Sequence, residues 1–167
     1  MNGSLYNFFV GDHRRLEKLL NRAWAQAPEY DIAHYGEFRL GLLRHIKMEE
    51  NVIIPEAQKI RGGQPLAFAQ KLRLEHAALV ALLVPPPSAP IINALRAILT
   101  QHNKLEESEG GLYDLCEQLV GQEADEVMKM VESVQDVPVL QYRVDSTVMG
   151  ALRRALERAG YKLDDYL

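Results

Sequence analysis

The sequence of 167 residues has one cysteine, little excess charge and no long apolar run. Because Cys116 cannot form a disulfide within the chain, a reducing compartment is favoured. The longest apolar run, residues 77–84, is far shorter than the roughly 20 residues that cross a bilayer. A net charge of -4 is unlike that of a general binder of nucleic acids or anionic membranes. With no pattern of a secretory signal at the start, we expect a soluble, cytoplasmic protein without nucleic-acid or membrane partners.

Alternation of apolar and polar residues with period two is also scarce, whereas apolar residues recur at three- and four-residue steps. This pattern predicts an all-α fold. Four long segments with short connections predict an antiparallel up-down four-helix bundle. The first predicted helix covers residues 12–25 with Asp12 as its cap, or starts earlier, at Ser4. The second covers about residues 30–55 with a kink or end at Pro55, and residues 56–60 can form another turn. The third covers residues 65–83 from Pro65 onward, and the fourth covers residues 91–120 with a disturbance at Gly110 and Gly111.

Beyond residue 121 the periodicity weakens but remains helical. Residues 123–134 and 146–158 are predicted helices, and the second is capped by Asp145 and ended by Gly160. Residues 136–144, which contain Pro138, are predicted to be extended. We therefore expect a bundle over residues 1–120 and a C-terminal helical extension over residues 121–167. The extension either packs on the bundle or forms the contact of a homodimer.

Two hexapeptides repeat one pattern of polar residues. Residues 45–50 and 102–107 both have the sequence His-x-Lys-apolar-Glu-Glu. On a helix, the spacing of four places His45 and Glu49 on one face, and likewise His102 and Glu106. Imidazole and carboxylate groups are natural ligands of first-row metals, so these pairs are candidates for two metal sites.

The two other predicted bundle helices each carry one histidine, His13 or His76, on an apolar stripe. A lone histidine in such a place is ordinarily a hydrogen-bonded core residue, and a single His-x-x-x-Glu pair is ordinarily a surface pair. The duplication on alternate helices favours a metal centre instead. Burying these groups without partners would cost on the order of several kcal/mol for each unpaired charge, which a shared metal cluster would avoid.

Taken in order, these motifs resemble the hemerythrin-like, HHE cation-binding domain over about residues 12–113. The resemblance implies a four-helix bundle with a non-haem di-iron centre, bridged by an oxo or hydroxo group. It implies that two histidines bind each iron and that two glutamates bridge the irons. In this sequence the implied ligands are His13 and His45 for one iron, His76 and His102 for the other, and Glu49 and Glu106 as bridges.

This chain departs from the oxygen-carrying hemerythrins at two positions. Leu72 stands where they have a further histidine, four residues before His76, and Glu106 stands four residues after the last histidine where they have an aspartate at five. The resulting set of four histidines and two glutamates predicts an open position on at least one metal, which favours binding of an exogenous ligand.

Several other residues have weaker cases. Glu75 and Tyr113 are predicted to orient ligands without binding metal, and Glu50 and Glu107 to face solvent or support the ligands. His34 is three turns, roughly 16 Å, from His45 and is predicted to lie at a helix start or on the surface. Cys116 is predicted to be an inert buried thiol.

Three functions remain open. We expect a di-iron protein that binds or senses dioxygen, nitric oxide or a related oxidant, rather than an enzyme. The alternative is a di-iron enzyme or iron-handling protein that breaks down peroxide, reduces nitric oxide or repairs iron centres. Because the donors also suit zinc and manganese, a third interpretation is a structural zinc site that unfolds when the metal is removed.

Overall fold

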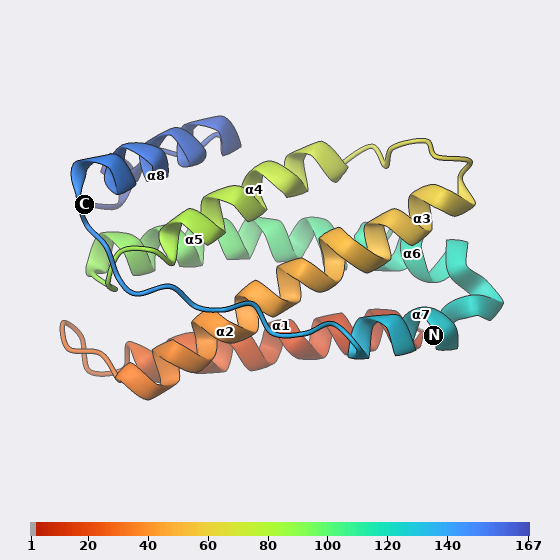
Figure 1. The fold of residues 1–167 in the computed structure, drawn as a ribbon, viewed down its shortest axis with the longest axis horizontal. Helices are drawn as coiled ribbons and strands as arrows, with labels where there is room; N and C mark the ends of the chain where they lie inside the picture. The colour runs from red at the N-terminus through yellow and green to blue at the C-terminus, as the bar shows by residue number, and fades with distance from the viewer. Residues whose placement is uncertain (1–2) are drawn as a thin grey trace.

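The computed structural model describes residues 3–167, so the first two residues of the predicted 1–120 unit lie outside the described part (Figure 1). Long helices lie side by side along one axis, and no β-strand occurs in the described chain. The prediction of an all-α up-down bundle is confirmed. The bundle helices are α1 (Ser4–Ala23), α2 (Ile32–Met48), α4 (Ala69–Leu82) and α5 (Ala89–Glu107).

Helix α1 begins at Ser4, the earlier of the two predicted starts. Leu5 and Phe9 continue the apolar stripe towards the N-terminus, and both are buried. Their burial stabilises the additional turns, because the stripe keeps the spacing of four that one helix face requires. Asp12 therefore lies inside the helix, and the expectation that it might cap the helix was wrong.

Pro55 does not end the second helical segment. After α2 the chain passes through a π-helical turn, η1 (Glu49–Ile53), into α3 (Ile54–Ile60), where Pro55 lies in the first turn. In this wider turn the N–H of Ile54 donates to the carbonyl of Glu49, five residues back. Proline is tolerated here because the first turn of a helix does not need its missing N–H. The π turn begins at Glu49, a predicted metal ligand, and π turns are frequent at functional sites.

Two other helix boundaries differ from the prediction. Helix α4 begins at Ala69 rather than Pro65, which lies in the connection before it. The segment predicted as 91–120 is two helices, α5 and α6 (Leu112–Val120), separated at the two glycines. Gly110 has a φ of +72°, which favours glycine, and a Cβ on Gly111 would lie 2.5 Å from the carbonyl oxygen of Leu105.

The C-terminal extension packs on the bundle. A 3-10 turn, η2 (Gly121–Glu123), leads into α7 (Ala124–Glu132), which contacts α1. Residues 134–145 are extended and return along α2, where Arg44 and Lys47 donate to their backbone carbonyls. Helix α8 (Ser146–Ala159) then packs on α4 and is followed by η3 (Leu163–Tyr166). The division at residue 120 into two units stays a prediction.

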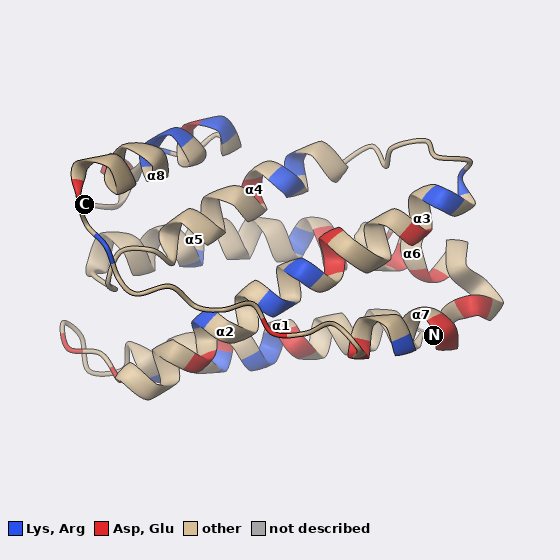
Figure 2. Ribbon diagram, viewed as in Figure 1, with Lys and Arg blue, Asp and Glu red and all other residues tan. Residues whose placement is uncertain are grey.

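Both predicted features of α8 are present. The Asp145 side chain accepts a hydrogen bond from the N–H of Val148, and Gly160, with a φ of +90°, ends the helix. Figure 2 shows basic residues along the outer side of α8. Arg153, Arg154 and Arg158 are exposed to solvent.

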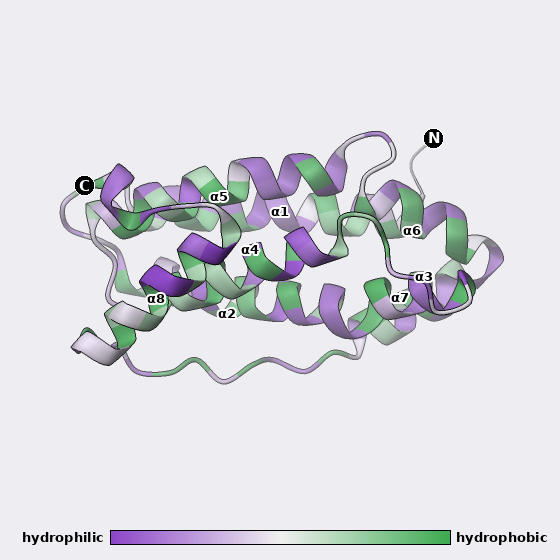
Figure 3. Ribbon diagram, turned by 90° about the horizontal axis from the view of Figure 1, so that it is seen from above, coloured by the Kyte–Doolittle hydropathy of each residue, from purple (hydrophilic) through white to green (hydrophobic). Residues whose placement is uncertain are grey.

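The core consists of two apolar clusters, one in each half of the bundle. One is built around Phe38, Leu79 and Leu95, and the other around Phe9 and Ile53. Figure 3 shows hydrophobic and hydrophilic residues alternating along the helices that contribute to both clusters. Within each bundle helix, the predicted metal ligands fall between the residues of the two clusters. None of the helices in residues 3–167 has the length and hydropathy of a membrane span.

Candidate metal centre

All six predicted ligands meet in the layer between the two apolar clusters. Each has a relative exposure of 3% or less. They come from four helices and the start of the π turn: His13 (α1), His45 (α2), Glu49 (η1), His76 (α4), His102 and Glu106 (α5).

The six residues form two groups that share both glutamates. One group is His13, His45, Glu49 and Glu106, and in it the four donor atoms lie within 4.8 Å of one another. The other group, within the same limit, joins the two glutamates to His76 and His102. This is the pairing of histidines that the family resemblance implied.

Each glutamate extends towards both groups. Glu49 has Oε1 at 3.1 Å from His45 Nε2 and Oε2 at 3.0 Å from His76 Nε2. Glu106 has Oε1 at 3.1 Å from His102 Nε2 and Oε2 at 3.3 Å from His13 Nε2. A carboxylate with one oxygen directed to each of two sites is suited to bridge two metal ions.

The Nε2 atoms of the four histidines converge in pairs. They are 3.0 Å apart between His13 and His45, and 3.1 Å apart between His76 and His102. In each ring the other nitrogen, Nδ1, faces outward to a carboxylate at 2.7–2.9 Å. Since Nδ1 donates to that carboxylate, Nε2 is directed to the centre, which is the orientation that a metal-binding histidine requires. The carboxylate partners are Glu107 for His13, Asp12 for His45, Glu50 for His76 and Glu75 for His102.

The residues expected to support the ligands lie against the histidines. Glu75 contacts the Nδ1 atom of His102, and Glu50 and Glu107 make the same contact at His76 and His13. Sequence reasoning missed Asp12, which it considered only as a helix cap. The start of α1 was the clue that could have found it. If the helix starts at Ser4, Asp12 lies within it beside His13, where its carboxylate can reach His45 of α2.

Tyr113 lies deeper in the site than predicted. Its hydroxyl is 2.5 Å from Glu49 Oε1 and 3.0 Å from Glu106 Oε2, and it is 3.0 Å from His13 Nε2. The break before α6 directs this side chain back into the bundle. Burial first, and then the charges of Glu106 and Glu49, raise the pKa of the Tyr113 hydroxyl well above its usual value. The group therefore keeps its proton.

Without metal, the charges of the site favour protonation of the histidines at the positions where cations would bind. Burial alone would lower the pKa of His45, but Glu49 and Asp12 outweigh it and raise the pKa to about 10. Burial likewise opposes the effect of Glu106 on His102, whose pKa is also raised to about 10. Burial favours protonated glutamate, yet the neighbouring histidines hold the pKa of Glu49 well below its usual value. The cluster thus concentrates negative charge around the inward-facing nitrogens.

Two glutamate oxygens indicate that the residues fit metal ions. Glu49 Oε2 and Glu106 Oε1 are fully buried and accept no well-formed hydrogen bond from the described residues, although histidine nitrogens lie within 3.0 and 3.1 Å. A buried carboxylate oxygen without a partner is costly, and coordination to a cation removes that cost. Together with the four directed imidazoles, these atoms provide the nitrogen and oxygen donors that iron, zinc or manganese accept.

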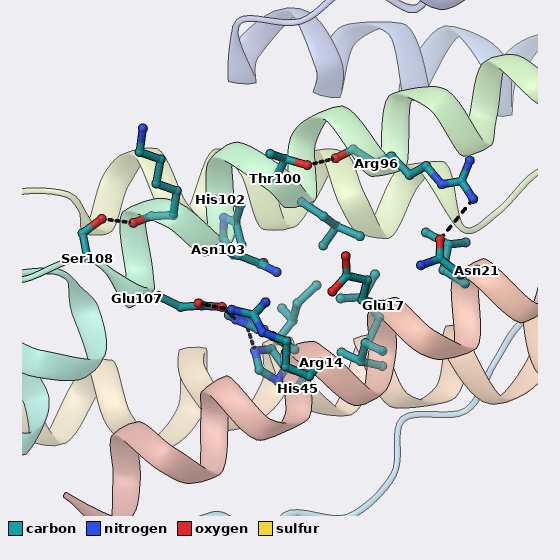
Figure 4. A pocket seen from close by; sticks show the side chains of 17 residues that line it. Arg14, Glu17, Asn21, His45, Arg96, Thr100, His102, Asn103, Glu107 and Ser108 are labelled. Atoms are coloured by element: carbon teal, nitrogen blue, oxygen red, sulfur yellow. Dashed lines mark hydrogen bonds and ion pairs between the residues drawn. The ribbon is translucent and has the colours of Figure 1, made fainter. Parts of the chain in front are cut away.

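A pocket of about 530 Å³ gives access to the centre from the side of α1 and α5. His13, His45 and His102 lie in its lining, and Leu20 and Leu99 contribute to its apolar wall. Figure 4 shows Arg96 and Asn21 at one end of this pocket and the pair of Arg14 and Glu107 beside the histidines. A small molecule can therefore approach the predicted metal ligands along a pocket whose apolar wall belongs to one of the two clusters.

The two residues predicted to have no role in the centre lie outside it. His34 is only partly exposed and lies at the start of α2, where its N–H donates to Asp31. Cys116 is buried near the carbonyl of Ile53, and burial raises the pKa of its thiol to about 12. A thiol that keeps its proton is a poor ligand and nucleophile, in agreement with the prediction.

The bundle and the two buried histidine–glutamate groups define a helical-bundle protein with a donor set suited to metal ions. Residues 4–111 match the family model of the hemerythrin HHE cation binding domain. The chain therefore belongs to the hemerythrin HHE family, as its motifs indicated. Comparisons with curated proteins and with solved structures found no match.

Proposed function

We propose that this chain is a non-haem di-iron protein that binds a small oxidant, dioxygen or nitric oxide, and acts as a sensor. The observation that carries the proposal is the pair of four-donor groups joined by Glu49 and Glu106. When bound there, two iron ions would supply redox chemistry and coordination positions for an exogenous ligand. With four protein donors to each metal in these groups, such positions remain for that ligand.

The protein residues have separate tasks in this proposal. The four histidines and two glutamates hold the metals, and the outward carboxylates keep each Nε2 directed inward. Leu72, fully buried one turn before His76, offers no donor atom on that face. The Tyr113 hydroxyl remains protonated and donates a hydrogen bond to Glu49 or Glu106, beside the His13 and His45 group. Neither Leu72 nor Tyr113 therefore adds a protein donor, and room is left for a ligand.

One observation favours the enzymatic alternative. The pocket volume of about 530 Å³ is many times the roughly 30 Å³ that one water molecule occupies in the liquid, so it exceeds what a diatomic ligand needs. A pocket of this size could admit peroxide with several ordered waters, or a larger substrate. Peroxide breakdown is therefore the second candidate function.

The deciding experiment is metal analysis with visible spectroscopy on protein loaded anaerobically with ferrous iron. Two irons per chain and a spectrum that changes with dioxygen or nitric oxide would support the sensor. Rapid, repeated turnover of hydrogen peroxide by the same sample would favour the enzyme. A protein that takes up only zinc and has no visible spectrum would contradict both.

A further inference from the structure

The outward carboxylates of the centre are themselves held in place. Three of the four carboxylates that support the histidines each contact a different arginine, at 2.6–3.2 Å. Two of the arginines are in α1 and one is in α4. Only Arg15 lies in the same helix as its carboxylate. The three chains are His13–Glu107–Arg14, His45–Asp12–Arg15 and His76–Glu50–Arg73.

The fourth carboxylate, Glu75, has no such arginine. It is fully buried, and the cation nearest to it is Lys71, 3.9 Å away and 62% exposed. Because the Lys71 ammonium is mostly solvated and lies 3.9 Å from the carboxylate, it contributes little. Instead, the hydroxyl of Tyr161 donates to Glu75 Oε1 at 3.1 Å, while Glu75 Oε2 accepts from His102 Nδ1 at 2.9 Å. The fourth chain is therefore completed by a residue that lies 86 positions further along the sequence.

The fold holds Tyr161 firmly in this place. Gly160 reverses the chain at the end of α8, and the N–H of Tyr161 donates to the carbonyl of Leu156 at 2.9 Å. Leu156 before the reversal and Leu163 after it are both buried in the apolar core. The phenol is thus fixed on both sides as it reaches α4.

We propose that Tyr161 is a positioning residue of the metal centre, and that the C-terminal extension completes the support of His102 through Glu75. This inference rests on the proposed metal binding. Loss of the hydrogen bond from Tyr161 to Glu75 would loosen the support of His102 alone. The ion held by His76 and His102 would therefore be the one affected, and its retention depends on the docking of α8.

The test compares Tyr161→Phe with Tyr166→Phe, a control in the same segment whose ring also packs against the core. Each protein is loaded with ferrous iron without oxygen and challenged with a chelator, and iron release is followed by absorbance and Mössbauer spectroscopy. Removing a direct partner of a metal-binding histidine typically costs 10–100-fold in affinity, and Tyr161 acts one residue further out. We expect about three- to tenfold faster release of one iron of the two in Tyr161→Phe, and release as in the wild type for Tyr166→Phe.

A second comparison shows whether Tyr161 acts through Glu75. In a Glu75→Leu background, Tyr161→Phe should have no further effect on iron release, because the carboxylate that it holds is gone. Equal acceleration in both backgrounds would overturn the proposal, and so would equal loss of both irons or unchanged release in the single variant. The measurement needs bound metal but no gas ligand, so failure of the sensor function leaves this test intact. If the wild type binds zinc instead, zinc release serves as the same readout.

Discussion

Protonation of His45 and His102 links this centre to pH. In the folded, metal-free chain the pKa of each imidazole is raised from 6.5 to about 10, because Glu49 and Glu106 are close and buried with them. The folded state therefore binds these protons more tightly than the unfolded state. Their contribution to stability is fully present below pH 6.5 and is lost as pH rises towards about 10. Metal ions compete for the same nitrogen atoms, so metal binding releases protons.

Stability should depend on pH in opposite directions without and with metal. Between about pH 6 and pH 8.5, the free energy of unfolding of the metal-free protein should fall because of these raised pKa values. The added stability from a fixed concentration of ferrous or zinc ion should rise over the same interval. Urea unfolding curves with and without metal would measure both. A metal contribution that falls with pH would contradict the assignment of His45 and His102.

Loss of one histidine should affect one group of donors. We expect His102→Ala to lower the content from two metals to about one, with an affinity loss above the roughly 100-fold upper range for supporting residues. His34→Ala is the matched control because that side chain lies in the first turn of α2, outside both donor groups. Metal analysis after dialysis would measure the content. Retention of two metals by His102→Ala would show that this residue is no ligand.

Tyr113 should act as a hydrogen-bond donor and not as a ligand. Tyr113→Phe is expected to keep two metals, while the metal-free protein loses about 1.5–3 kcal/mol of stability, the usual contribution of a hydrogen bond to a charged group. The loss should be smaller in the loaded protein, where metal ions satisfy Glu49 and Glu106. A tyrosinate-to-iron charge-transfer band in the ferric wild type, absent from the variant, would instead make Tyr113 a ligand.

At the scale of elements, each Glu-Glu pair lies at an interruption of its helix. The π turn starts at Glu49, and the break at residues 108–111 follows Glu107. The first widens the helix at Glu49, and the second brings Tyr113 inward. The shape of the centre therefore depends on helix irregularities as well as on helix spacing.

The Gly110–Gly111 break yields a stability prediction. Because a Cβ on Gly111 would meet the carbonyl oxygens of Leu105 and Glu106 at 2.5 and 2.7 Å, Gly111→Ala should cost about 1–3 kcal/mol and disturb metal binding through Glu106. Gly36→Ala in α2, where nothing lies within 4 Å, should stabilise by up to about 1 kcal/mol. Thermal unfolding and metal content would be measured for both variants. Similar effects of the two substitutions would contradict this account of the break.

These elements also show how far the sequence alone could predict the site. Helical spacing was sufficient for His45 with Glu49 and for His102 with Glu106, because a regular helix relates residues four apart. It was insufficient for Asp12 and Tyr161, whose partners are on other elements and depend on packing between helices. The further turn expected after Pro55 is present as part of α3, but the π turn before it was not predicted, since such a turn has no clear pattern in the sequence.

At the scale of the whole molecule, the metal centre lies between two apolar clusters that do not include the ligands. Each cluster buries side chains from several helices, so most of the hydrophobic stabilisation does not depend on metal. In a structural zinc site, by contrast, removal of the metal unfolds the domain. The two apolar clusters therefore distinguish the proposed centre from such a site.

The corresponding prediction concerns removal of the metal. Treatment with a chelator should leave the helical circular dichroism signal nearly unchanged and lower the Tm. Restoring metal at about 100 times its dissociation constant should return roughly 2.7 kcal/mol for each site. Circular dichroism during thermal unfolding would measure this. Loss of the helical signal on chelation at room temperature would favour the structural zinc interpretation.

The two repeated hexapeptides have a final consequence for the origin of this architecture. Helices α1 and α2 contribute His13, His45 and Glu49, and α4 and α5 contribute His76, His102 and Glu106. Each antiparallel pair thus supplies a lone histidine followed by a His-x-x-x-Glu-Glu sequence, and the contacts of Glu49 with His45 and His76 are repeated by Glu106 with His102 and His13. This is the ligand set that duplication and fusion of a single helical hairpin would produce. Two copies of one designed hairpin should therefore be enough to rebuild the whole donor set as a symmetric dimer.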